Sequence, residues 1–345
     1  MTRVSVIIPC YNREDLLGAT LDSVHAQTFG DWEAIVVDDH SQDNSVEVAR
    51  SYAQSDNRIR VVSRQSQLKG GSICRNEGLA LARGDYIIFL DSDDLLCEEC
   101  MQHRVAAMDR ASDCGFGVFQ TELFTQIIGD RSVLWNAFID ANDLHRFLSL
   151  DSVWATTGPI WRKTALEGLG GFDEEALSFQ DWELHIRALI AGIKYFKKAV
   201  RDNFHRHAYS DHKTITGVKD KQKEHLVSHQ KLFTKIFHAL REARLLDEET
   251  QTRLAGAFWW LAGMWESQGN LRAALSVWYN AASLGLCSWQ NYFEGWLVLA
   301  LYSRRRGAPI IHWLKRSWPR GFTSLGSPYH FNAPMDVKAN LDQNR

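Results

Sequence analysis

Short apolar runs alternate with amphipathic stretches along the first quarter of this chain, and this alternation constrains the fold more than any other feature. Strands that alternate with helices of this length form a parallel sheet. We therefore expect an α/β domain with a Rossmann-like, mostly parallel sheet. The expected strands are Val4–Ile8, Glu33–Val37, Ile59–Ser63 and Tyr86–Leu90, and the expected helices are Leu16–Gln27, Ser45–Ser55 and Ile73–Ala82.

Polar segments follow three of these strands directly, namely Pro9–Asn12, Asp38–Asp39 and Asp91–Asp94. Because the carboxyl ends of parallel strands meet at one edge of a sheet, the three segments should converge on one cleft. The last segment carries three carboxylates within four positions, and such crowded acids call for a counter-ion. Carboxylate oxygens suit a hard divalent cation, so the sequence predicts a metal site there. The alternative is a solvated loop whose acid caps the following helix.

Composition and apolar runs narrow the class of protein. A formal net charge of -3 argues against a nucleic-acid binder that works through bulk charge. The first apolar run is stopped by Pro9 and is too short for a signal peptide, and the run Trp296–Tyr302 is too short to cross a bilayer. We therefore expect a cytoplasmic protein. Cys97 and Cys100 form a Cys-x-x-Cys, but no second pair follows at zinc-site spacing, which favours ordinary thiols over a zinc site.

The residue pattern changes after Gly217, which suggests three parts: a catalytic domain over residues 1–215, a helical region over 216–321 and a flexible tail over 322–345. The helical region contains one match to a tetratricopeptide unit, whose small residues would let two antiparallel helices approach closely. The alternative is a plain helical hairpin packed on the catalytic domain. The matching residues are Phe258, Leu261, Ala262, Trp265, Gly269, Ala274, Trp278 and Ala281.

Several separate motifs occur in a characteristic order over residues 1–215. They are Val4-Ser5-Val6-Ile7-Ile8-Pro9-Cys10-Tyr11-Asn12, Val36-Val37-Asp38-Asp39-His40-Ser41, Gly71 with Arg75-Asn76-Glu77-Gly78, Leu90-Asp91-Ser92-Asp93-Asp94, Gln180-Asp181-Trp182-Glu183, and Arg206-His207 with Ser210. Together they resemble the family 2 glycosyltransferases of the GT-A fold. The resemblance implies an inverting transfer of a sugar from a nucleotide-diphosphate donor to an acceptor hydroxyl, and we expect the donor to be a UDP-sugar.

The resemblance gives five residues a task in holding the nucleotide sugar. Pro9 and Tyr11 would border the base, and an aromatic face offers stacking worth about 1 to 3 kcal/mol. Asp38 or Asp39 would accept hydrogen bonds from the base and the ribose, and in similar enzymes the second acid, here Asp39, contacts a uracil ring. Arg75, near a helix start, would face the diphosphate.

Alternatives exist for two of these residues. Asp38 could instead cap its own turn through Ser41, as aspartates often do in loops. Arg75 could be an exposed arginine that pairs with Glu77 or Asp85.

The same resemblance assigns the metal ligands and the base. Asp93 would be the first ligand of Mn²⁺ or Mg²⁺, with Asp91 or Asp94 touching the ribose or completing the metal shell. His207 would contact the metal or the diphosphate, and an imidazole ligand would favour Mn²⁺. Asp181 would be the general base, kept ionised by a helix start and a nearby cation, and its alternative role is a helix N-cap. Gln180 departs from the family, which usually has Glu before this Asp.

Function and location follow from these assignments. We expect a glycosyltransferase that elongates a cell-envelope polysaccharide or a lipid-linked glycan. The alternatives are a sugar nucleotidyltransferase, which should show a glycine-rich Arg-Lys signature after its first strand, and an inactive scaffold. Basic residues and tryptophans over 296–320 predict contact with an anionic membrane on its cytoplasmic face. A solvated helix docked through its tryptophans explains the same stretch.

Overall fold

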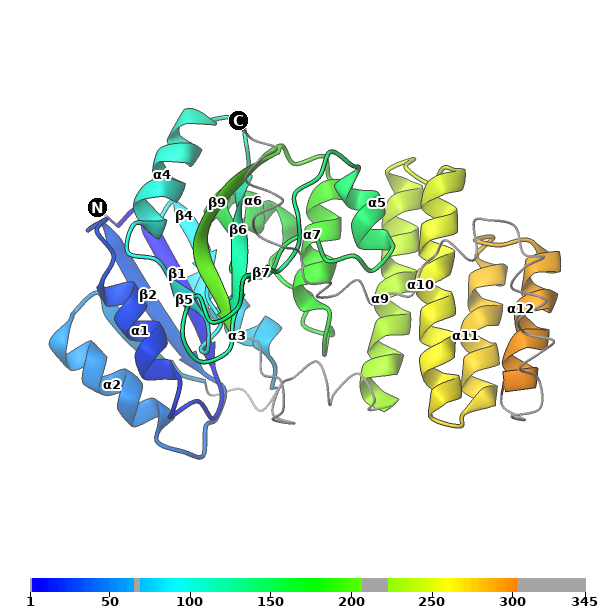
Figure 1. The fold of residues 1–345 in the computed structure, drawn as a ribbon, viewed down its shortest axis with the longest axis horizontal. Helices are drawn as coiled ribbons and strands as arrows, with labels where there is room; N and C mark the ends of the chain where they lie inside the picture. The colour runs from blue at the N-terminus through cyan, green and yellow to red at the C-terminus, as the bar shows by residue number, and fades with distance from the viewer. Residues whose placement is uncertain (1, 65–68, 207–222, 303–345) are drawn as a thin grey trace.

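The computed structural model describes residues 2–64, 69–206 and 223–302, and within them a sheet packed with helices is followed by a row of long helices (Figure 1). The described strands form one sheet in the order β3-β2-β1-β4-β8-β6-β9-β5, with β7 paired to β6. Their bounds are β1 Val4–Cys10, β2 Trp32–Asp38, β3 Ile59–Ser63, β4 Tyr86–Phe89, β5 Leu95–Leu96, β6 Phe116–Phe124, β7 Val133–Leu134, β8 Pro159–Arg162 and β9 Tyr195–Arg206.

The first four strands pair in parallel, as the alternation of apolar runs predicts. In the register of β1 and β2, Cys10 lies opposite Asp38, so the two loops that follow these strands leave the sheet side by side. Beyond β4 the sheet is mixed, because β8 runs antiparallel to both β4 and β6 while β6 and β9 are parallel. The carboxyl ends of β1, β2 and β4 therefore share one edge, which becomes the candidate site.

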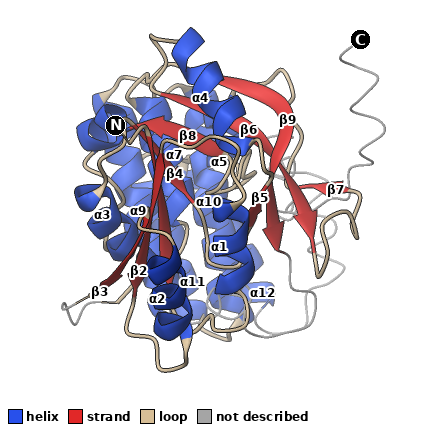
Figure 2. Ribbon diagram, turned by 90° about the vertical axis from the view of Figure 1, so that its left-hand side faces the viewer, coloured by secondary structure: helices blue, strands red, loops and turns tan. Residues whose placement is uncertain are grey.

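Helices cover both faces of the sheet (Figure 2). Alternate side chains of β1 enter different cores: Val6 and Ile8 pack with α1 and α4, whereas Ile7 packs with α3 and the helices that follow. This two-residue period is what a strand buried on both faces requires. The helices are α1 Leu17–His25, α2 Ser45–Ser55, α3 Gly71–Leu81, α4 Cys100–Arg110, α5 Asp143–Leu148, α6 Lys163–Leu169 and α7 Gln180–Ile190.

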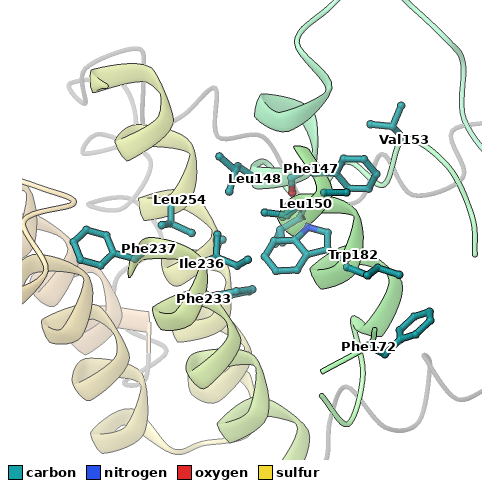
Figure 3. Packing of buried hydrophobic residues seen from close by; sticks show 14 of the residues in the cluster. Phe147, Leu148, Leu150, Val153, Phe172, Trp182, Phe233, Ile236, Phe237 and Leu254 are labelled. Atoms are coloured by element: carbon teal, nitrogen blue, oxygen red, sulfur yellow. Dashed lines mark hydrogen bonds between the residues drawn. The ribbon is translucent and has the colours of Figure 1, made fainter. Parts of the chain in front are cut away.

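The second core continues without a break into the helical region. Trp182 of α7 packs on Phe233 of α9, with ring centroids 5.4 Å apart, and its indole N–H donates to the Phe147 carbonyl at 2.7 Å (Figure 3). The helical region comprises α9 Lys223–Glu242, α10 Glu248–Ser267, α11 Leu271–Ser283 and α12 Trp289–Tyr302. It is thus joined to the sheet part by a shared apolar core and not only by the chain.

Helices α10 and α11 form the predicted hairpin. Ala262, Ala274 and Trp278 are fully buried between helices, and Asn270 begins α11 by accepting a hydrogen bond from the Ala273 N–H at 3.1 Å. The small residues allow the close approach that the pattern predicts. Its reading as a tetratricopeptide unit stays a prediction, as do the domain boundaries.

Candidate active site

Arg75 is the residue around which the strand ends are organised. Its guanidinium donates to Asp91 Oδ1 at 2.6 Å and to Gln180 Oε1 at 2.7 Å, and the side chain is more than nine-tenths buried. Asp91 follows β4, and Gln180 begins α7, so Arg75 of α3 joins three segments that are far apart in sequence. The departure from the family at position 180 gives Arg75 a neutral partner in place of a second carboxylate.

Asp181 lies beside this group, at the first turn of α7. Thr156 donates its hydroxyl to Asp181 Oδ2 at 3.0 Å, and the Trp182 N–H donates to Oδ1 at 2.9 Å. Burial raises the pKa of Asp181 from its ordinary value, and the charge of Asp91 adds to this, while Arg75 and the two hydrogen bonds oppose it. Burial therefore outweighs the helix start and the cation that sequence analysis expected to dominate. A carboxylate whose pKa is moved toward neutrality is better matched to a general base.

In the acidic loop after β4, Asp94 is bound by protein groups, whereas Asp93 is more accessible. Asp94 is fully buried and accepts hydrogen bonds from the Thr157 hydroxyl, the Arg206 backbone N–H and a ring nitrogen of His205, each at 3.0 Å. Asp93 is more open and lies 3.7 Å from the Arg13 guanidinium. The structure thus gives Asp94 three protein partners, and the prediction that it binds metal stays a prediction.

The pKa of Asp93 shows that the acidic loop lacks positive charge. Burial, followed by the charges of Asp94 and Asp91, raises the pKa of Asp93 to about 6, although Arg13 and His205 act in the opposite direction. A carboxylate destabilised by its neighbours gains from a cation placed beside it. The oxygens of Asp93 and Asp91 therefore fit a hard divalent ion in their donor chemistry. Among the described residues, no three His, Cys, Asp or Glu side chains already form a metal cluster.

Sequence analysis missed His205 and quoted Arg206 only as part of a motif, without a role, and His207, which was chosen there as a ligand, lies outside the described residues. Burial tends to lower the pKa of His205, but the carboxylates of Asp94, Asp93 and Asp91 raise it to about 9. Arg206 donates its side-chain N–H groups to the carbonyls of Asp93 at 3.1 Å and Thr125 at 3.0 Å. Both residues sit at the end of β9, and for Arg206 the sequence signal was its place beside His207 in the last motif.

The nucleotide-facing residues lie at the ends of β1 and β2. Asp39 forms a buried ion pair with Arg64 and accepts from the Gly70 N–H at 2.9 Å. Asp38 accepts from the Ser41 N–H at 3.2 Å, which is the turn-capping alternative that sequence analysis left open.

Tyr11 is close to half exposed, and the Lys69 ammonium lies 5.3 Å from its ring centroid. Pro9 pairs with Val37 one residue before the strands end. An open aromatic ring beside a cation and two acids is suited to a base and its ribose, and ligand contacts by these residues stay predictions.

Comparison with known proteins identifies a family to which the first part of the chain is similar. Residues 5–143 match the model of the family described as glycosyl transferase family 2. The chain carries a family 2 glycosyltransferase domain. The match spans β1 to the start of α5 and so includes the predicted nucleotide residues and the acidic loop, whereas Asp181 lies beyond it.

Two similar proteins are named as glycosyltransferases that act in polymer biosynthesis or on a polymer. The chain is 31% identical over 199 residues to the amylovoran biosynthesis glycosyltransferase AmsB of Erwinia amylovora, covering 55% of this chain and 65% of the relative. It is 38% identical over 101 residues to the poly(ribitol-phosphate) beta-glucosyltransferase of Bacillus spizizenii, covering 29% of this chain and 16% of the relative. The chain therefore spans less than two thirds of the length of either relative.

The fold extends beyond the family match. Residues 1–349 of S. aureus TarS, solved in complex with UDP, superpose with a TM-score of 0.59 at 16% identity, covering 95% of this chain and 91% of that one. At this identity the likeness concerns the fold, and it confirms a GT-A sheet followed by a helical region.

Proposed function

We propose that this protein transfers a sugar, with inversion, from a UDP-sugar to a hydroxyl group of a polysaccharide or a lipid-linked glycan. The observation that carries the proposal is the cluster around Arg75, which sets a buried cation, Asp91 and the start of α7 with Asp181 side by side at the strand ends. The family domain supports glycosyl transfer. The relatives named for amylovoran biosynthesis and for glucosylation of poly(ribitol-phosphate) support a polymeric acceptor, and the UDP bound to TarS supports the donor base.

Single displacement with inversion needs one base, and Asp181 fills that role. The acceptor hydroxyl would lose its proton to Asp181 as its oxygen attacks the anomeric carbon and the bond to the diphosphate breaks. Thr156 and the Trp182 N–H hold the carboxylate in one orientation, so its geometry is set before the acceptor arrives. Base assistance contributes about 10² to 10⁴ in rate.

Arg75 would stabilise the negative charge that collects on the leaving diphosphate, since a guanidinium offers several N–H donors to phosphate oxygens. Tyr11 would stack on the uracil ring. Asp39 can pair with Arg64 and still accept from the base, because a carboxylate has about four acceptor sites.

A divalent ion fits the acidic loop, with Asp93 and Asp91 as the residues that would hold it and Asp94 and His207 as the other predicted ligands. Bound Mn²⁺ or Mg²⁺ would supply Lewis-acid stabilisation of the leaving diphosphate. The raised pKa of Asp93 supports this reading, because a nearby cation would favour the ionised form.

Release of UDP from UDP-glucose and UDP-N-acetylglucosamine tests the proposal, with Mn²⁺ or Mg²⁺ added. Asp181→Asn should lower turnover by about 10² or more and leave donor binding intact. Asp93→Ala should remove the metal-dependent part of donor binding, read by thermal shift. Asp109→Asn is a matched control, because Asp109 pairs with Arg3 and the Tyr86 hydroxyl at the opposite ends of the strands. Full activity in Asp181→Asn would refute the assigned base.

The two alternatives make different predictions in the same experiment. A nucleotidyltransferase would form a nucleotide sugar from UTP and a sugar phosphate. An inactive scaffold would release no UDP from any donor, and neither Asp181→Asn nor Asp93→Ala would change its binding to partners.

We also propose that α12 contacts the anionic surface of a membrane on the cytoplasmic side. Trp289, Phe293, Trp296 and Leu297 fall on one helical face, and each is more than two-fifths exposed. In the sequence, Arg304-Arg305-Arg306 follows directly, and no acid occurs from Gly295 to Met335. Aromatic residues suit the interface, and each cation near an anionic surface adds about 1 kcal/mol. No helix in the described ranges is long and apolar enough to cross a bilayer.

Co-sedimentation with phosphatidylglycerol vesicles, compared with pure phosphatidylcholine vesicles, tests this contact at low and high salt. Phe293→Ser with Trp296→Ser should reduce binding to the anionic vesicles, while Ile127→Ser in the loop after β6 serves as an exposed apolar control. No binding of the unchanged protein would refute the membrane contact. A dimer that these two substitutions dissociate would instead make the face an interface between copies.

A further inference from the structure

The segment 173–179 leads directly into α7 and is therefore the piece of chain that sets where Gln180 and Asp181 begin. We call it the presenting segment. From its contacts we infer that helix α9 is a positioning element for the catalytic base, so that the helical region completes the active site. This inference rests on the proposed role of Asp181.

Three residues on one stripe of α9 hold the backbone and the serine of the presenting segment. Ser228 accepts from the Leu177 N–H at 3.2 Å and donates to the Glu175 carbonyl at 3.0 Å. His225 and His229 contact the Ser178 hydroxyl through ring nitrogens at 2.9 Å and 2.7 Å. Ser178, His225, Ser228 and His229 are all buried, so water does not compete for these bonds.

The two contacts of the Ser178 hydroxyl require different protonation of the facing nitrogens of His225 and His229. A serine hydroxyl has one proton, so it donates to one imidazole and accepts from the other. Both bonds exist together when one ring carries a proton on the facing nitrogen and the other ring does not. Burial, followed by the charge of His225, lowers the pKa of His229 to about 3, so this ring stays neutral at physiological pH.

Ion pairs with Lys235 of α9 hold the first turn of the presenting segment. The Lys235 ammonium of α9 donates to Asp173 Oδ2 at 2.6 Å and to Glu175 Oε2 at 2.9 Å. Asp173 in turn accepts from the Glu175 N–H at 2.9 Å, which closes the turn. On the other side, Arg187 of α7 donates to the carbonyls of Leu169 and Gly171, each at 2.6 Å.

Phe179 ends the segment in a backbone conformation that needs outside support. Its φ of 58° lies in the left-handed region, which a bulky residue adopts only when its surroundings impose it. Its ring stacks on His229 with centroids 4.4 Å apart. The conformation aims the next two residues, so Gln180 reaches Arg75 and Asp181 reaches Thr156.

These contacts explain why a shared core joins the two parts of the molecule at this place. Trp182, one residue beyond the base, packs on Phe233 of α9 (Figure 3). The base is thus held on both sides in sequence by residues that touch α9. Loosening α9 should move Asp181 while leaving the strand-end residues that face the nucleotide in place.

Kinetics of His229→Leu, His229→Gln, Ser178→Ala and Trp278→Phe test the inference, with UDP-N-acetylglucosamine as donor and UDP binding measured by calorimetry. His229→Leu and Ser178→Ala should lower kcat on the order of 10-fold to 100-fold, because small misplacements of a catalytic group are costly, with KM and the Kd for UDP almost unchanged. His229→Gln keeps a polar atom near the position of Nε2 and should recover most of kcat. Trp278→Phe removes a hydrogen bond to the Tyr292 carbonyl in α11–α12 and should lower the melting temperature without changing kcat.

Hydrogen exchange provides a second readout that needs no turnover. In His229→Leu the amides of residues 173–182 should exchange faster, while those of β1 and β2 should not change. Unchanged exchange there, or a loss of melting temperature with kcat per folded molecule preserved, would overturn the inference. Failure of the proposed function looks different, because the unchanged protein would then release no UDP or Asp181→Asn would remain active.

Discussion

The buried ion pair between Arg104 of α4 and Asp202 of β9 gives the sharpest quantitative prediction. Both side chains are fully buried, and the guanidinium donates to the two carboxylate oxygens at 3.0 Å and 2.7 Å. Arg104 also donates to the Thr157 carbonyl at 2.8 Å, and the Thr157 hydroxyl holds Asp94. The pair therefore lies directly beneath the acidic loop of the site.

Arg104→Met should leave the Asp202 carboxylate buried without its cation. Breaking such a pair costs about 3 to 5 kcal/mol. The carboxyl can avoid remaining charged by taking a proton, and from an ordinary pKa of about 3.9 this limits the cost to about 4.2 kcal/mol at pH 7 and about 1.5 kcal/mol at pH 5. The deficit should therefore shrink as pH falls, because protonation removes the buried charge.

The double variant Arg104→Met with Asp202→Leu removes both charges and should recover part of the loss. The Thr157 carbonyl still loses its donor, so a deficit of about 1 to 3 kcal/mol should remain. Urea denaturation at pH 7 and pH 5 measures all three proteins, with Trp278→Phe as a control that carries no charge. A deficit in Arg104→Met that does not change with pH, or a double variant less stable than Arg104→Met, would refute the reasoning.

Three further outcomes follow from the site and the core. Arg75→Lys keeps the charge but cannot make both side-chain hydrogen bonds, so UDP affinity should fall about tenfold by calorimetry. Tyr11→Ala should cost about 1 to 3 kcal/mol of UDP binding, and Tyr11→Phe should cost nothing, because stacking uses the ring face. Burial lowers the pKa of His185 and of His229 to about 3, so the unfolded state takes up protons first as pH falls below about 6.5. These two histidines should contribute no pH dependence above that pH, and each should lower stability by about 1.4 kcal/mol per pH unit below it. His185→Phe should therefore reduce the slope by about 1.4 kcal/mol per pH unit in urea denaturation.

Local elements were predictable where one sequence period dominated. Helix α2 and strand β3 match their predicted bounds, and β1, β2 and β4 differ by one or two residues at one or both ends, because a buried parallel strand is a short apolar run between polar turns. Strand β9 was not predicted as a single strand. Its middle, from Lys198 to Arg201, is exposed at apolar and charged residues alike, and a register irregularity there breaks the alternation.

The candidate site was predictable at the strand ends and less so elsewhere. Asp93 and Asp181 were chosen from motifs, and the structure places Asp91, Arg75 and Asp181 in one electrostatic environment. Arg13, Thr156 and His205 were missed. Each acts through a partner far away in sequence, so no local pattern marks it.

The sequence alone determined that a parallel sheet would gather acids at one edge, because alternating apolar runs fix the strands and strands fix the direction of their ends. Only the tertiary structure decided how those acids are used. It committed Asp94 to three protein partners, left Asp93 short of positive charge, and placed α9 against the chain that leads to Asp181. The reason is physical: burial and long-range neighbours set the charge, the pKa and the orientation of a side chain. Neither burial nor these neighbours can be deduced from the residues adjacent in sequence.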